Sequence, residues 1–262
     1  MTETALHTDL HIDRDGPVAI VEIRRPPHNF FDIALTRALA DAFEALDADP
    51  AVRASVLCSQ GTAFCAGADF SGGPTVFDGV RDRPVNPLYD EGIRIFACAK
   101  PIVAAVQGAA VGGGLGLALA ADFRVTCEAA RFSANFARLG VHPGFGLSVT
   151  LPRLVGAQRA SLLMMTGRRV GGAEAVSIGL ADVLAPHEQV RSRALALAAE
   201  LAASAPLAVE SIRRTLRTGL VDEIRAMVRH ETAEQARLAA TEDFREGIAA
   251  MTARRAPVFR RR

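Results

Sequence analysis

Apolar and polar positions follow a regular order along the first part of the chain. Leu6–Ile12 and Val18–Ile23 are short alternating runs on either side of Asp13-Arg14-Asp15-Gly16-Pro17, a pattern typical of a hairpin. Ile33–Asp47 has apolar residues at helical spacing, and Ser55–Ser59 is a short apolar run typical of a strand. Strands and helices therefore alternate, as in an α/β protein.

The central apolar stretch, Pro101–Thr126, predicts the core of this arrangement. Ile102–Val106 indicates a fully buried strand of a parallel sheet, and Leu115–Ala121 is rich in Ala and Leu, which favours a buried helix. Between them lie Gly108 and the triplet Gly112-Gly113-Gly114. A glycine turn at the N-terminus of a helix offers free N–H groups and the positive end of the helix dipole to a ligand oxygen.

A second glycine-rich turn, Gly61–Asp69, follows the strand predicted at Ser55–Ser59. Two such turns could each aim one N–H group at the same oxygen, which would form an oxyanion hole worth about 3 kcal/mol per donor. The alternative interpretation is two tight turns that only permit close packing. Neither turn matches a phosphate-binding loop or a G-x-G-x-x-G motif.

The remaining patterns predict a change from mixed to purely helical structure near residue 185. Ser71–Pro87 is rich in Gly and Pro and predicts a mobile loop, while Gly140–Gly146 is a third glycine-rich turn. From His187 onward every periodic segment is helical: His187–Ala203, Leu207–Thr218, Val221–Ala240 and Glu242–Arg254. We therefore expect an α/β region over residues 1–185 and a C-terminal helical region over residues 186–262.

Composition narrows the class of protein. The chain has 262 residues, of which half are hydrophobic, and its net charge of +1 does not favour a nucleic acid or an anionic membrane as partner. The four cysteines lack C-x-x-C spacing and no secretory signal opens the chain, so we expect a reducing, cytoplasmic location. The histidines have no ligand spacing with cysteines or carboxylates, and no metal site is expected.

Four stretches together resemble the signature segments of the crotonase family, the enoyl-CoA hydratase/isomerase superfamily. They are GTAFCAGADF (61–70), GAAVGGGLGLALAADFRV (108–125), FSANFARLGVHPGFG (132–146) and TEDFREGIAAMTARRAPVF (241–259). The resemblance implies a spiral of ββα units with a C-terminal helical region that trimerises. It also implies a homotrimer or a dimer of trimers, and an acyl-CoA thioester as ligand, with no cofactor beyond the coenzyme A of the substrate. The family's oxyanion donors correspond to the backbone N–H groups of Ala68 and Gly113.

The chain departs from the family pattern at both catalytic carboxylates. The two glutamates that family hydratases carry correspond to Gly116 and Phe136, and the aspartate of dienoyl isomerases corresponds to Gly144. General acid–base groups contribute about 10²- to 10⁴-fold each, so we expect a poor hydratase. Hydration by other groups, thioester or carbon–carbon bond hydrolysis and decarboxylation stay open. Of these reactions, decarboxylation needs the fewest catalytic groups, because stabilisation of the enolate supplies most of the rate acceleration.

Other residues could replace the missing carboxylates or bind the substrate. His142, on the third glycine turn, is the leading catalytic candidate because histidine titrates near neutral pH; the alternative is a turn histidine that points away from the site. Tyr89, Glu231 and Glu234 are weaker candidates, and Asp69 is expected to be structural. The resemblance places the substrate near a further set of residues: Arg25, Ala66, Phe70, Gly112, Gly116, Phe136 and Phe259.

Three functions are consistent with these observations. The first is a CoA-thioester enzyme with an intact oxyanion hole and non-standard acid–base groups. The second is a catalytically silent member that binds acyl-CoA. The third is an RNA-binding relative, which would need a comb of basic side chains on one helix. Only Arg213, Arg214 and Arg217 form such a cluster, and the near-zero net charge argues against it.

Overall fold

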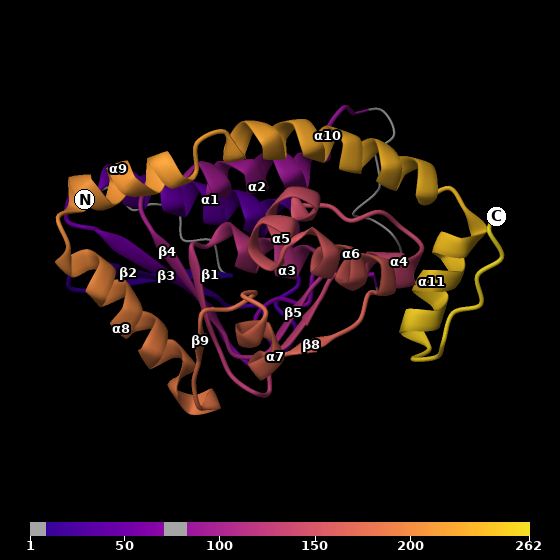
Figure 1. Cartoon of the computed structure of the whole chain (residues 1–262), viewed down its shortest axis with the longest axis horizontal. Helices are drawn as coiled ribbons and strands as arrows, with labels where there is room; N and C mark the ends of the chain where they lie inside the picture. The colour runs from indigo at the N-terminus through magenta and orange to yellow at the C-terminus, as the bar shows by residue number, and fades with distance from the viewer. Residues whose placement is uncertain (1–8, 71–82) are drawn as a thin grey trace.

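The computed structural model of the chain describes residues 9–70 and 83–262. In this part, strands form two sheets and helices lie on both sides of the larger one (Figure 1). The predicted α/β class is confirmed. Most of the loop predicted at Ser71–Pro87 lies outside the described residues.

The larger sheet carries the central strand predicted from the sequence. Its order is β1-β2-β3-β4-β6-β9, in which β1 pairs with β2 antiparallel and the other neighbours are parallel. The bounds are β1 (Leu10–Asp15), β2 (Val18–Ile23), β3 (Ala54–Ser59), β4 (Ile102–Val106), β6 (Phe123–Thr126) and β9 (Val183–Leu184). All residues of β2 and β4 are buried, as expected for parallel strands that are covered on both faces.

The hairpin at the start of the chain differs in detail from the prediction. Strand β1 continues through Asp15, which pairs with Val18, so the turn consists of Gly16 and Pro17 alone. The residues expected to form a longer turn lie on the edge strand of the sheet. Charged residues suit such an edge, because they oppose pairing with another chain.

A smaller sheet of order β5-β7-β8 was only partly predicted. It contains β5 (Ala109–Val111), β7 (Arg131–Ser133) and β8 (Val170–Gly171), and only β7 was expected. Strands β5 and β8 are too short to show any periodicity, and the neighbouring glycines favoured a turn in that stretch. These residues form strands because each segment pairs with β7, and not because of their composition.

Helices connect and cover the strands. Their bounds are α1 (Ile33–Ala48), α2 (Pro87–Ala97), α3 (Gly113–Ala120), α4 (Phe136–Leu139), α5 (Leu147–Val155), α6 (Ala157–Thr166), α7 (Gly172–Ser177), the 3₁₀ helix η2 (His187–Gln189), α8 (Val190–Ala203), α9 (Pro206–Leu216), α10 (Leu220–Leu238) and α11 (Glu242–Thr252). Side chains cap three of them, since Asp32, Asn86 and Thr241 each accept a hydrogen bond from the first turn of the helix that follows.

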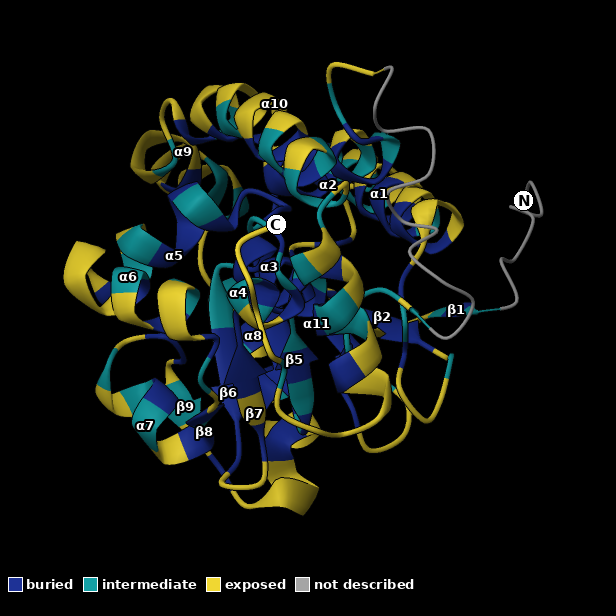
Figure 2. Cartoon of the chain, turned by 90° about the vertical axis from the view of Figure 1, so that its right-hand side faces the viewer, coloured by how far each residue is buried: buried dark blue, intermediate teal, exposed yellow. Residues whose placement is uncertain are grey.

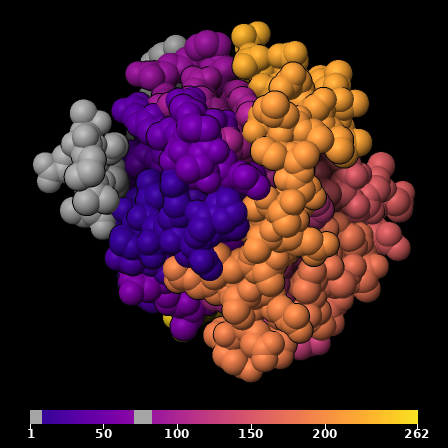
Figure 3. Space-filling view, turned by 90° about the vertical axis from the view of Figure 1, so that its left-hand side faces the viewer, coloured from indigo at the N-terminus to yellow at the C-terminus, as the bar shows by residue number. Residues whose placement is uncertain are grey.

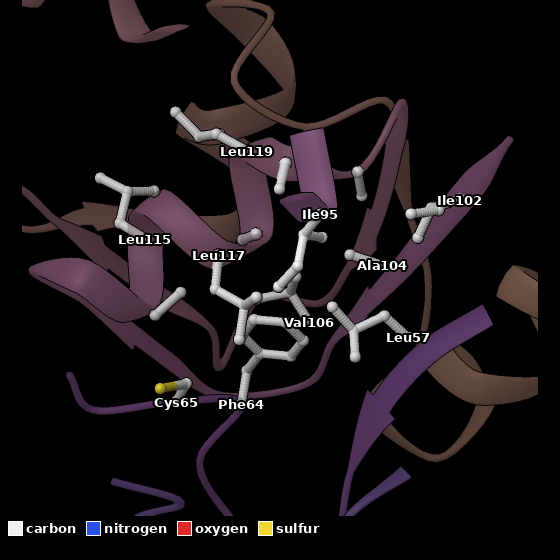
Figure 4. Close-up of a cluster of buried hydrophobic side chains, with 14 of the residues drawn as sticks. Leu57, Phe64, Cys65, Ile95, Ile102, Ala104, Val106, Leu115, Leu117 and Leu119 are labelled. Atoms are coloured by element: carbon white, nitrogen blue, oxygen red, sulfur yellow. The ribbon is translucent and has the colours of Figure 1, made fainter. Parts of the chain in front are cut away.

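The core lies between the larger sheet and α3. Leu57 of β3, Val106 of β4 and Leu117 of α3 gather around the ring of Phe64 (Figure 4). Nearly every side chain of α3 is buried, which explains why this segment lacks an amphipathic pattern. In Figure 2 strands β2 and β6 are largely dark blue, whereas the outer faces of α6 and α10 are yellow.

Helix α8 covers the opposite face of the same sheet. Its buried residues, Val190, Ala194, Ala198 and Ala202, recur at a spacing of four and therefore form one stripe. This helix contacts β2, β3, β4 and β6, and the small alanine side chains let it lie close to the strands. The first helix after residue 185 thus packs directly on the α/β sheet.

Within the described ranges, no helix is by itself long and apolar enough to cross a membrane. The bent pair His187–Ala203 and Pro206–Leu216 reaches that length and composition only when the two are taken together.

Two glycine turns meet where β5 enters α3. The Cys65 N–H donates to Ala109 O at 2.9 Å, and Val111 N–H donates to Cys65 O at 3.0 Å, so one residue of the first turn forms a parallel bridge with β5. A Cβ atom on Gly114 would lie 2.0 Å from Cys65 O. The two turns therefore touch backbone to backbone, and only glycine fits at position 114.

We expect Gly114→Ala to lower the free energy of unfolding by about 3 kcal/mol or more, because the added methyl group meets backbone atoms that cannot move without breaking the bridge. Gly219→Ala is a matched control, since Gly219 has φ of +76° but open space around its Cα. We expect the free energy of unfolding of this control to fall by only about 1 kcal/mol, the cost of a non-glycine residue at positive φ. Urea unfolding of both variants checks the prediction, which equal losses would contradict.

Candidate active site

The junction of the two glycine turns forms one wall of a cavity. Gly67 has φ of +86°, and a Cβ atom there would lie 2.7 Å from Val111 O and 3.7 Å from Gly113 N. Gly112 has φ of +57° and donates its N–H to Ser133 O at 2.9 Å. These left-handed conformations favour glycine and bring the next residue of each turn, Ala68 and Gly113, to the same wall.

The N–H groups of Ala68 and Gly113 have no hydrogen-bond partner in the described part of the chain. Their neighbours do have one: Ala66 N–H donates to His28 O at 2.9 Å, and Gly67 O accepts from Phe31 N–H at 3.0 Å. Gly113 is also the first residue of α3, where N–H groups lack intrahelical acceptors and the helix dipole is positive. Both N–H groups are thus available to an oxygen atom.

The cavity has a volume of about 770 Å³ and mostly apolar walls. This volume is typical of small-molecule sites. The lining residues that carry polar or charged side chains are His28, Asp69, Tyr89, Asn135, Arg169, Thr252 and Arg254. Asp69 is the sole carboxylate among the described lining residues, and it directly follows Ala68.

The position of the first family glutamate is blocked by an aromatic ring. A Cβ atom on Gly116 would lie 2.8 Å from Cδ1 and 2.9 Å from Cβ of Phe145. The Phe145 ring also contacts Phe31, Tyr89 and Phe96, with centroids 5.7, 6.1 and 6.1 Å apart. Phe145 has φ of +61°, which is unusual for a bulky residue. The ring therefore fills the space that a side chain at position 116 would need.

The position of the second family glutamate presents an apolar side chain. Phe136 is the first residue of α4, is only 8% exposed and lines the cavity. At both positions to which the resemblance assigns a carboxylate, the structure has a phenyl ring: that of Phe136 itself and that of Phe145 beside Gly116.

His142 does not line this cavity. Its ring packs against His230 of α10, with centroids 5.6 Å apart, and its Nδ1 lies 2.8 Å from Pro143 O. Its backbone carbonyl accepts a hydrogen bond from Gln235 Nε2 at 3.0 Å. The structure thus brings Ala68 and Gly113 together and places the third catalytic candidate against a different helix.

Several predicted substrate contacts line the cavity and others do not. Ala66, Phe70, Gly112 and Phe136 line it, whereas Gly116 is covered by Phe145. Arg25 is not among the lining residues; it pairs with Asp9 at 2.8 Å and Asp32 at 3.0 Å. Phe259 is 42% exposed on the C-terminal segment and does not line the cavity either.

Three lining residues with basic side chains were not identified from the sequence. His28 lies in the loop after β2, Arg169 follows α6, and Arg254 follows α11. They come from distant parts of the chain, and no local motif marks them. Only the tertiary structure brings them to one cavity.

Helix α10 contributes buried polar side chains behind the aromatic ring of Phe145. Gln235 accepts a hydrogen bond from the Tyr89 hydroxyl at 2.8 Å. Glu231 accepts from Gly146 N–H at 2.9 Å and from Ser148 N–H at 3.1 Å, and so caps the start of α5. Burial raises the pKa of Glu231 to about 7, although these hydrogen bonds oppose the shift. Glu234 is paired with Arg237 and lies outside the cavity.

Two other groups are held neutral by burial. Burial raises the pKa of the Cys65 thiol to about 12, which agrees with a small apolar filler and not with a nucleophile. Burial also raises the pKa of Tyr89 above its ordinary value, so its hydroxyl stays protonated. No group of three or more His, Cys, Asp or Glu suited to a metal ion occurs among residues 9–70 and 83–262.

Comparison with known proteins identifies the family. Residues 13–262 match the profile described as enoyl-CoA hydratase/isomerase. The chain belongs to the enoyl-CoA hydratase/isomerase family. The predicted resemblance is thus confirmed, and the protein is a member of a family of lyase- and isomerase-type enzymes.

Relatives in this family share about a third of their residues with the chain. A probable enoyl-CoA hydratase of Bacillus subtilis (strain 168) is 32% identical over 252 residues, covering 94% of this chain and 96% of the relative. A carnitinyl-CoA dehydratase of Salmonella typhi is 33% identical over 260 residues, covering 97% and 98%. The crystal structure of an enoyl-CoA hydratase/isomerase from Pseudoalteromonas atlantica T6c has a TM-score of 0.85 at 31% identity, covering 97% and 100%.

We expect Gly116→Ala to lower the free energy of unfolding by about 1–3 kcal/mol, because its methyl group overlaps the Phe145 ring. In the Phe145→Gly background, the same change costs at least about 1 kcal/mol less, since the clashing atoms are gone. A double-mutant cycle by urea unfolding measures this coupling. Gly156→Ala serves as the uncoupled control, because a Cβ atom at this position would have no atom within 4 Å. Additive losses for Gly116 and Phe145 would contradict the overlap.

Glu231 predicts a pH-dependent stability. Its pKa rises from 4.5 to about 7 on folding, so the folded chain holds a proton that the unfolded chain releases. The stabilisation is complete below about pH 4.5 and is lost as the pH rises through 7, by at most about 1.4 kcal/mol per unit.

We expect Glu231→Gln to flatten this decline, measured as urea stability at pH 5 and pH 8. The control is Glu234→Gln, on the same helix but partly exposed and ion-paired. If both variants keep the slope of the unmodified chain, the proton on Glu231 does not cause it.

Proposed function

We propose that the cavity binds an acyl-CoA thioester whose carbonyl oxygen lies between the N–H groups of Ala68 and Gly113. The supporting observation is that neither N–H group has a partner among the described residues and that both lie on one wall of a largely apolar cavity, with Gly113 at the N-terminus of α3. Such donors favour an oxyanion over the neutral carbonyl, each by about 3 kcal/mol. A thioester enolate is the anion that this pair would stabilise.

The reaction that fits this cavity best is decarboxylation of a malonyl-type thioester. The bond between Cα and the carboxylate breaks, CO₂ leaves, and the electron pair passes to the thioester as an enolate. A proton from water then completes the product. This sequence needs oxyanion stabilisation but no pair of carboxylates, and such a pair is what the positions of Gly116 and Phe136 lack.

Other groups in the cavity suit the remainder of the substrate. Arg169 and Arg254 line it, and their guanidinium groups are suited to phosphate oxygens. Coenzyme A would enter as part of the substrate and no further cofactor is proposed. Assembly into a homotrimer or a dimer of trimers, and a cytoplasmic location, remain part of this proposal.

A silent acyl-CoA-binding protein is the second candidate, favoured by the two phenyl rings at the glutamate positions. The structure does not support the RNA-binding alternative, because the three arginines do not form an exposed basic row. Arg213 is buried, and both Arg213 and Arg217 pair with Asp122 inside the protein. Of the three arginines, Arg214 alone is exposed.

The test is turnover of crotonyl-CoA and malonyl-type thioesters by the purified protein, followed by mass. We expect the protein to release CO₂ from a malonyl-type thioester. We expect it to hydrate crotonyl-CoA more slowly than it releases CO₂, by about 10²-fold or more. Ala68→Pro removes one donor N–H and should lower kcat by about 10²- to 10³-fold. Ala68→Gly retains that N–H and should keep most of the activity.

Rapid hydration of crotonyl-CoA would refute the role assigned to the missing glutamates. Binding of both thioesters without turnover would favour the silent protein. Equal activity of Ala68→Pro and Ala68→Gly would contradict the proposed role of the Ala68 N–H as an oxyanion donor.

A further inference from the structure

A second cavity of about 510 Å³ lies between α5, α8, α9 and the junction of α3 with β6. Helices α8 and α9 face the viewer in Figure 3. No residue that lines this cavity also lines the one at Ala68 and Gly113. Its volume lies in the range of small-molecule sites.

The walls of this second cavity are mostly apolar. They include Leu119, Phe123, Leu154 and Leu201. Ile212 and Leu216 of α9 also line it, although 59% and 78% of their surface is exposed, so they form its rim. Large apolar side chains this exposed, around an apolar hollow, are typical of a binding site.

Arginines that are buried or partly buried outnumber their partner carboxylates beside this cavity. Arg124, Arg213 and Arg217 all line it, whereas among the described residues only the carboxylates of Asp122 and Asp182 pair with them. A fourth lining arginine, Arg153, forms a more exposed pair with Glu223. The inner cluster therefore carries one positive charge more than its partners neutralise, and buried charges are normally paired.

The carboxylate of Asp122 is fully engaged by its neighbours. It accepts hydrogen bonds from Arg213 Nε and from Ile102 N–H, both at 2.9 Å, and forms an ion pair with Arg217 Nη2 at 3.0 Å. Burial lowers the pKa of Arg217 to about 10, and the charges of Arg213 and Arg124 oppose the effect of Asp122 on it. Even so, Arg217 is charged at neutral pH.

One donor in this cluster is left over. Arg213 is 9% exposed; its Nε is bound to Asp122 and its Nη1 to Cys98 O. Its Nη2 is buried and has no hydrogen-bond partner among the described residues. An unpaired buried donor is costly, and a donor on a charged group more so, which makes an acceptor at this place favourable.

We propose that this second cavity binds an amphiphilic anion, a carboxylate with an apolar chain, whose head group accepts from Arg213 and whose chain lies along the apolar walls. The surplus positive charge selects an anion over a neutral lipid. The apolar lining selects a chain over a small inorganic ion. The site is separate from the cavity at Ala68 and Gly113, so this proposal does not depend on the reaction catalysed there.

The test uses decanoate as the probe and a reporter at the rim. The chain contains no tryptophan, so Leu216→Trp introduces a single indole, at the rim of the cavity. Its fluorescence emission reports binding at this cavity and not at distant sites. In this background we expect a saturable change of emission with decanoate, and binding of decanol weaker by about tenfold. Ile212→Glu adds a negative charge at the rim and should weaken decanoate binding by about tenfold.

Two variants serve as matched controls. Ile212→Gln adds polarity without charge, and Arg214→Glu changes the charge of the same helix at an exposed position outside the cavity. Each should weaken decanoate binding by less than about threefold. No saturable change, equal binding of decanol, or equal loss in Ile212→Glu and Arg214→Glu would overturn the proposal. So would a signal that depends on protein concentration, which would mean that a second copy of the chain covers this face.

Discussion

The backbone bridge between Cys65 and strand β5 is the contact on which the site depends. Through it, two turns that are distant in the sequence are fixed to each other by main-chain hydrogen bonds. Main-chain contacts of this kind do not depend on side-chain rotamers, so they hold the turn that carries Ala68 against the turn that carries Gly113. Such preorganisation is what makes hydrogen-bond donors effective toward a developing negative charge.

The packing behind the glycine turns explains how this cavity differs from a site that holds a pair of catalytic carboxylates. Phe145 occupies the volume next to Gly116, and its ring is held by other aromatic rings. Polar side chains of α10 then satisfy the backbone of the turn that carries Phe145. The carboxylate of Glu231 is therefore kept behind the aromatic layer, bound to backbone N–H groups of the turn.

The sequence was sufficient for the parts of the structure that depend on local pattern. The buried strand β4, the helix α3 and the glycine turns all follow from composition and spacing. Strands β5 and β8 could not be predicted, because their only reason to be strands is the partner beside them. The same limit applied to the site, where Ala68 and Gly113 followed from a motif. The contact of His142 with His230 and the convergence of Arg169 and Arg254 depend on tertiary packing alone.

The ring of Phe145 also has an evolutionary consequence. It lies against Gly92 as well as Gly116, and a Cβ atom at Gly92 would be 2.7 Å from it. These positions belong to two different helices and a turn, and neither glycine can gain a side chain without a steric conflict while the ring is in place. A glutamate at position 116 would therefore need a second substitution, one that shortens the side chain at position 145. The two positions are coupled by epistasis, because the residue allowed at one depends on the residue present at the other.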